Sequence, residues 1–237
     1  MFSMLIMRSV STSREADLTT RARIRDAAIG YFAEHGFTST TVRAIAAKAG
    51  VSPALVIHHF GSKENLREFC DGYVTDRIDE LARQSAEKLS PGDMLDQLAQ
   101  APEVAHLSSY VIRTLSVGGD FADRLWVRIV DDTEAYLDAA VAAGIVRPTS
   151  ADERSRAEML AAFKLGAQLL ARYLLPPSHT GPPVLAIAER FTLPALELFT
   201  HGMYTTPAYL DAYLAQQRAT DSSPAADGGG SPKGQGA

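Results

Sequence analysis

Four side chains in the segment Thr40–Leu66 are of the types, and at the spacing, that could enter a groove of DNA. At helical spacing they share one face of a predicted helix: Pro53, Ala54, Ile57 and His58. His58 alone can donate a hydrogen bond, whereas the other three offer apolar contacts of the kind made with thymine methyl groups. The chemistry that this set indicates is non-covalent reading of double-stranded DNA rather than catalysis.

The residues around these four predict two short helices joined by a glycine turn. Thr41 is a good N-cap for the first, whose narrow apolar face consists of Ile45, Ala46 and Ala49. Gly50 suits a turn with positive φ. Ser52 caps the second helix, with Pro53 at its first position. This order of elements is the plan of a helix-turn-helix DNA reader, although a hairpin of two helices that serves only packing has a similar outline.

The rest of the chain is predicted to be helical, so the expected fold class is all-α. Apolar residues at helical spacing begin at Thr20, and Gly36 ends this first helix. A long helix opens after Ser62 and runs to about Leu89. Further helices are expected at Gly92–Gln100, Pro102–Val117, Asp120–Ala143, Ala151–Leu175, Val184–Tyr204 and Pro207–Arg218, with Pro194 expected to kink or interrupt its helix. Residues 1–18 are predicted to form a flexible arm and residues 219–237 a disordered, low-complexity tail.

Charge is distributed unevenly along the chain. The net charge is −5, but Arg8 to Arg67 contains nine Lys and Arg against five Asp and Glu, a net +4, which leaves −9 for the remainder. A basic end on an acidic body suits phosphate contact confined to that end. A single cysteine excludes a disulfide framework, and no apolar run approaches the roughly 20 residues of a membrane span, so a cytoplasmic protein is expected. Translation could start at Met1, Met4 or Met7.

Motifs of enzymes and metal sites are absent from the sequence. It contains no G-x-S-x-G, P-loop, C-x-x-C or H-E-x-x-H pattern, so no catalytic residue, cofactor or metal is expected. Cys70 lies in an apolar stripe and is expected to be an inert buried thiol, although a redox role stays open.

Three stretches in order, EHGF, TTVRAIAAKAGVS and HHFGSKENL, make residues 20 to 70 resemble the DNA-binding domain of the TetR family of bacterial transcriptional regulators. The resemblance implies a helix-turn-helix domain at 19–64 and a helical ligand-binding and dimerising domain at 65–218. It also implies DNA contacts through Thr41, Arg43, Ser52, His58, His59 and Lys63, in addition to Pro53, Ala54 and Ile57. Of these, Thr41 and Lys63 are expected to contact phosphates. For His59, contact with DNA and packing in the core are equal alternatives.

The predicted groove-facing surface departs from the family pattern at one position in particular. The family usually has a tyrosine where this chain has Ile57, and often a polar residue or glycine at Pro53 and Ala54. Specificity is therefore expected to depend on thymine methyl contacts, His58, Arg43 and DNA shape.

The resemblance also implies a small-molecule effector that binds in the acidic body. Eight aromatic and sulfur-containing side chains are candidates for an apolar pocket: Phe69, Tyr73, Met94, Tyr110, Phe121, Trp126, Met159 and Phe163. His106 and Gln168 are candidate polar anchors, and ordinary core packing is the alternative for each residue. The expected effector is small and largely apolar, and its binding would tilt the helix that starts at Lys63.

A homodimer bound to a palindromic operator is the expected assembly. Two apolar stripes could pair between subunits, Leu160, Phe163, Ala167, Leu170 and Leu174 on one helix, and Leu185, Ala188, Phe191, Ala195 and Phe199 on the next. Closure of the monomer core by both helices is the alternative. Two further questions stay open: whether the chain represses or activates transcription, and whether it has kept the fold but lost DNA binding.

Overall fold

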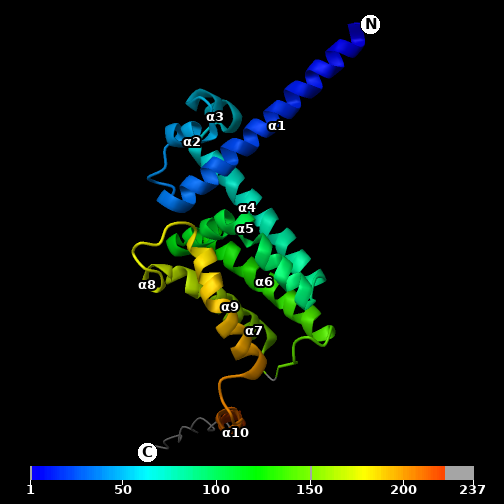
Figure 1. The fold of residues 1–237 in the computed structure, drawn as a ribbon, viewed down its shortest axis with the longest axis vertical. Coiled ribbons are helices and arrows are strands. Elements are labelled where there is room, and N and C mark those ends of the chain that lie inside the picture. Colours follow the sequence, from blue (N-terminus) through cyan, green and yellow to red (C-terminus); the bar gives the residue numbers. More distant parts are fainter. Residues whose placement is uncertain (1, 150, 222–237) are drawn as a thin grey trace, which may run out of the picture. The chain divides into compact units, whose positions relative to one another are not determined.

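The structure is a computed structural model that describes the backbone of residues 2–149 and 151–221, and side chains at 18–90, 92–93, 105–149 and 151–218. Every regular element in these residues is a helix, which confirms the all-α prediction. Figure 1 shows their succession along the chain. The helices are α1 (Phe2–His35), α2 (Val42–Ala49), α3 (Pro53–Phe60), α4 (Lys63–Glu87), α5 (Pro91–Val117), α6 (Asp120–Ala142), α7 (Glu153–Leu169), α8 (Ala171–Leu174), α9 (Pro183–His201) and α10 (Ala208–Asp221).

The first helix is longer than the sequence predicts. α1 begins at Phe2, whereas residues 1–18 are expected to form an irregular arm. The stretch contains Met, Leu, Arg and Glu, which favour helix, and no proline or glycine that would stop a helix from growing backwards from Thr20. Its C-terminus is as predicted, because Gly36 follows with φ +79° and its N–H bonds to the carbonyl of Phe32.

Two prolines do not interrupt their helices. α5 is one helix that runs through Pro102, where the sequence predicts a boundary, and α9 runs through Pro194, where the sequence predicts a kink or an interruption. A proline inside a helix removes one backbone bond and strains the preceding turn, but long helix-forming flanks can tolerate it. The predicted helix Ala151–Leu175 is instead divided at Leu170, where φ −90° and ψ 5° separate α7 from the single turn of α8.

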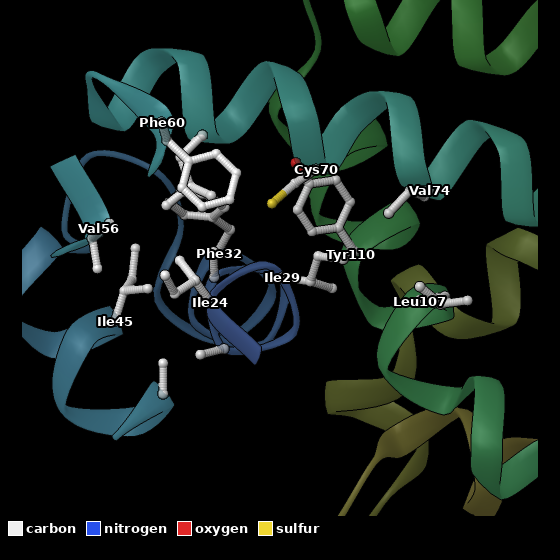
Figure 2. Close-up of a cluster of buried hydrophobic side chains, with 14 of the residues drawn as sticks. Ile24, Ile29, Phe32, Ile45, Val56, Phe60, Cys70, Val74, Leu107 and Tyr110 are labelled. Atoms are coloured by element: carbon white, nitrogen blue, oxygen red, sulfur yellow. The ribbon is translucent and has the colours of Figure 1, made fainter. Parts of the chain in front are cut away.

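The largest apolar core is built around α1. Ile24, Ile29 and Phe32 of α1 are at most 4% exposed, and α1 packs against α2, α4 and α5. Figure 2 shows these side chains between Ile45 and Val56 on one side and Tyr110 and Leu107 on the other. The short helices α2 and α3 therefore share one apolar core with α4 and α5, where the acidic body begins.

A second, smaller core forms where α6 packs on α7, around Val130, Leu137, Ala157 and Ala161. The opposite face of α7 and α8 remains open, with Met159 at 60%, Leu170 at 53% and Tyr173 at 70% exposure. The chain divides into two compact units, of which the first ends at Arg190 and the second begins at Phe191. None of the helices in the described residues has the length and apolarity that crossing a membrane requires.

Candidate nucleic-acid interface

The frame of the helix-turn-helix is set by local hydrogen bonds that the sequence predicts. The Thr41 side chain accepts from the N–H of Ala44 at 3.1 Å, and that of Ser52 accepts from Leu55 at 3.2 Å. Gly50 adopts φ 66° and ψ 39°, and its N–H bonds to carbonyls of α2. These bonds fix where α2 ends and where α3 begins, and so confirm the predicted caps and turn.

One face of α3 is buried and the other is open. Val56 and Phe60 are 1% and 7% exposed in the main core, whereas Pro53, Ala54 and His58 are exposed and Ile57 is 44% exposed. His59 is half-buried, with its ring 5.6 Å from that of His58 and 6.3 Å from that of Phe60. The structure thus brings together the four side chains predicted to face a groove.

Among the other predicted contacts, three side chains are exposed and a fourth is turned toward the protein backbone. Thr41, Arg43 and Ser52 are exposed. Lys63, however, directs its ammonium group to the protein backbone, and donates to the carbonyl oxygens of Phe37 at 3.1 Å and Thr40 at 3.0 Å. The same group lies 4.3 Å from the centre of the Phe37 ring. Lys63 therefore ties the first residue of α4 to the loop that precedes α2.

Two arginines of α1, which the sequence analysis does not single out, brace the end of α3 and the start of α4. The guanidinium of Arg21 lies 5.1 Å from the Phe60 ring and 5.2 Å from the Phe69 ring, and that of Arg25 lies 3.6 Å from the Tyr73 ring. Such cation–π contacts depend on tertiary neighbours. The only sequence signal is the basic run Arg21, Arg23 and Arg25 on a helix with an apolar face.

The seven candidate ligand residues whose side chains the structure describes are dispersed rather than gathered around one cavity. Phe69 and Tyr73 contact these arginines, Tyr110 and Phe121 belong to the main core, and Trp126 packs on the second core. Met159 and Phe163 are 60% and 50% exposed on α7, and the side chain of Met94 lies outside the described residues. Aromatic character alone does not separate core, surface and pocket positions.

An open cavity of about 650 Å³ lies elsewhere, between α1, α5, the end of α7 and the loop before α9. Its lining contains both predicted polar anchors, His106 of α5 and Gln168 of α7. None of the seven aromatic and sulfur-containing candidates whose side chains the structure describes lines it.

A buried hydrogen bond joins α4 to α5 beneath the helix-turn-helix. The Tyr110 hydroxyl donates to Oδ1 of Asp71 at 2.5 Å, and Arg67 lies 3.8 Å from the other carboxylate oxygen. Burial raises the pKa of the Asp71 carboxyl, although the bond from Tyr110 and the nearby arginines oppose this. Burial, together with the charge of Asp71, raises the pKa of the neighbouring Cys70 thiol to about 12, which fits the predicted inert thiol.

Comparison with known proteins identifies the family. Residues 24–69 match the model for bacterial regulatory proteins of the tetR family, and residues 102–205 match the tetracyclin repressor-like C-terminal domain. The HTH-type transcriptional regulatory protein RaaS of Mycobacterium tuberculosis is 44% identical over 208 residues, which cover 86% of this chain and 95% of the relative. The chain belongs to the TetR family.

Solved structures of TetR-family proteins share the fold. The regulator PfmR of Thermus thermophilus superposes with a TM-score of 0.52 at 20% identity, over 77% of this chain and 99% of PfmR. SmeT, the repressor of the Stenotrophomonas maltophilia multidrug efflux pump SmeDEF, gives 0.50 at 22% identity, over 79% and 97%. At such identities the likeness concerns the fold alone.

TetR-family membership settles the class of activity. The chain is a transcriptional regulator with a helix-turn-helix DNA-binding domain and not an enzyme. In the part of the chain that the structure describes, no group of three or more His, Cys, Asp or Glu side chains could hold a metal ion. The predicted domain boundaries and individual DNA contacts remain predictions.

Proposed function

We propose that the protein is a homodimeric repressor that binds a palindromic operator through the open face of α3 and is released by a small-molecule effector. The observation that carries this proposal is the exposure of Pro53, Ala54, Ile57 and His58 on a helix whose caps and opposite face are fixed. An exposed helix face on a rigid support is what entry into a major groove requires.

The assembly proposal rests on the open apolar face of α7 and α8. Side chains as large as Met159, Leu170 and Tyr173 are rarely left in water together without a partner. A second copy of the chain would cover them and set the spacing of the two α3 helices. The sequence analysis includes Leu160 in this apolar stripe, but Leu160 packs against the second core. The exposed residue at this end of the face is its neighbour Met159.

The effector proposal leaves out the apolar character that the sequence analysis expects of the effector. Because the aromatic candidates do not share a cavity, they give no support for a largely apolar molecule. What supports effector binding is the cavity beside α1, the helix on which α2 packs.

A genomic selection tests the proposal. The purified full-length protein is mixed with fragmented genomic DNA at about 0.15 M salt, and the bound fragments are sequenced. We expect a palindrome whose half-sites lie about one helical turn apart. Random recovery of fragments would overturn operator binding, and a single unrepeated half-site would overturn the dimer.

Variants assign the contacts within the recovered site. His58→Ala should weaken operator binding by about 1–3 kcal/mol and relax preference at one base pair. Arg43→Ala should weaken binding to all DNA sequences. It should also reduce the slope of log K against log salt concentration by about 1. Arg147→Ala, which removes an exposed cation in the loop between α6 and α7, is the matched control and should change neither.

A further inference from the structure

The wall of the cavity on the α5 side carries a row of polar groups. His106, Ser109, Arg113 and Ser116 follow one another at helical spacing and all line the cavity. They present an imidazole, two hydroxyls and a guanidinium along one face of the helix. The Ser109 and Ser116 hydroxyls donate to the backbone carbonyls of Ala105 at 3.0 Å and Ile112 at 2.6 Å, so the donors that suit an anionic molecule are the imidazole and the guanidinium.

Arg113 provides the positive charge for such a molecule. Its side chain is exposed, and among the described residues it forms no ion pair with a carboxylate. Glu34 also lines the cavity from α1, and its Oε1 lies 3.7 Å from Nε2 of His35. A planar guanidinium available in this way is suited to two parallel hydrogen bonds with a carboxylate.

The opposite wall contains a glycine in the interior of α1. Glycine weakens a helix interior relative to alanine, so Gly30 is a costly choice for a helix of this length. A Cβ at Gly30 would meet nothing within 4 Å, which shows that space adjoins the backbone there. The missing side chain widens the cavity opposite the polar row of α5.

Arg113 also touches the element that supports the helix-turn-helix. Its Nη2 lies 2.8 Å from where a Cβ of Gly36 would be, so the guanidinium rests against the residue that ends α1. The Gly36 carbonyl accepts from Oγ1 of Thr40 at 2.7 Å, and the Thr40 carbonyl accepts from Lys63. A continuous set of contacts thus leads from the cavity to the loop before α2 and to the first residue of α4.

We propose that this cavity binds a small carboxylate-bearing molecule through Arg113, and that binding draws the guanidinium away from Gly36 and changes the affinity for DNA. The inference rests on the proposed function for its effect on DNA, but not for the binding site itself. It places the effector against α1, a helix of the DNA-binding domain, rather than among the aromatic residues of the acidic body.

A tethered carboxylate tests the inference without knowledge of the natural ligand. Ser116→Cys introduces an exposed thiol three residues from Arg113, whereas the native Cys70 is fully buried. This protein is treated with 2-carboxyethyl methanethiosulfonate, which attaches a carboxylate on a short arm, or with methyl methanethiosulfonate, which attaches an uncharged methyl group. Mass spectrometry confirms one adduct per chain. Ser155→Cys, exposed at the start of α7 and outside the cavity lining, is the matched control.

Two readouts separate the site from its effect. If the site binds a carboxylate, the charged adduct on Ser116→Cys raises Tm by at least about 2 °C over the methyl adduct. This difference disappears when Arg113→Ala is added and is absent from Ser155→Cys. The charged adduct also weakens binding to the operator from the genomic selection by about fivefold or more.

The outcomes distinguish failure of the inference from failure of the proposed function. Equal Tm values for the two adducts, or a difference that survives Arg113→Ala, would overturn the carboxylate site. A Tm difference that depends on Arg113 without any change in operator affinity would overturn the coupling. If no operator is recovered at all, the proposed function fails, and the Tm comparison still decides whether the cavity binds a carboxylate.

Discussion

Lys63 shows how a single residue can combine recognition with support. The family resemblance assigns it to a DNA phosphate, but its ammonium group already donates to Phe37 and Thr40, both in the loop before α2. An ammonium has three donors, so one remains for a phosphate. Loss of DNA binding in a Lys63 variant would therefore report on two roles at once.

Stability measurements separate these roles. Lys63→Met should lower the free energy of unfolding by about 1–3 kcal/mol, because two half-buried carbonyls lose a charged donor. Arg43→Ala, which removes an exposed side chain, should change it by less than about 0.5 kcal/mol. Urea unfolding of both variants and the wild type provides the comparison. Equal stability of the two variants would show that the Lys63 bonds contribute nothing to folding.

Asp71 makes stability depend on pH. Burial raises its folded-state pKa above the ordinary value of 3.8, so the folded protein holds this proton more tightly than the unfolded chain. The stability that comes from the neutral carboxyl is complete below 3.8 and is lost as pH rises through the raised folded pKa.

Asp71→Asn removes the titration while keeping an acceptor for the Tyr110 hydroxyl. The stability of the wild type relative to Asp71→Asn should therefore increase as the pH falls from about 7 toward about 4. Urea unfolding of both proteins across this range is the measurement. A difference that stays constant, or that shrinks in acid, would contradict the raised pKa.

At the scale of helices and turns, the sequence predicts best where the cause is local. Thr41, Ser52 and Ser62 all cap the helices that they are expected to cap, because a hydroxyl bonds to an N–H three residues on. Pro102 and Leu170 are mispredicted because packing and helix-forming flanks outweigh or override local preference. Of the residues that line the cavity, the sequence indicates only His106 and Gln168, since Arg113 meets Gly36 through tertiary structure alone.

Gly50 offers a direct test of the turn. A Cβ there would meet nothing within 4 Å, so Gly50→Ala has no steric clash and only the strain of φ 66°. We expect a loss of about 1–2 kcal/mol of folding free energy. Gly72→Ala, at an exposed interior position of α4 with equal room, should instead stabilise the protein by about 0.5–1 kcal/mol. If urea unfolding showed that both variants change the free energy of unfolding in the same direction, the assigned role of the turn would be contradicted.

For the molecule as a whole, the open face of α7 and α8 should determine the assembly. Met159→Glu combined with Leu170→Glu places two charges on exposed apolar positions and should convert a dimer into monomers without unfolding the chain. Sedimentation velocity measures the mass, and circular dichroism confirms helix content. A wild-type protein that sediments as a monomer, or a double variant that still sediments as a dimer, would exclude this face as the interface.

The bond between Asp71 and Tyr110 gives α4 the mechanics of a lever with unequal arms. From Lys63 to Asp71 the helix measures about 12 Å, and from Asp71 to Glu87 about 24 Å. If the helix pivots at that bond, a displacement at its far end reaches the helix-turn-helix at roughly half its size. A ligand bound in the proposed site beside Gly36 would act on the loop that Lys63 holds, at the end of the short arm, and would need only about half the displacement for the same effect on α3.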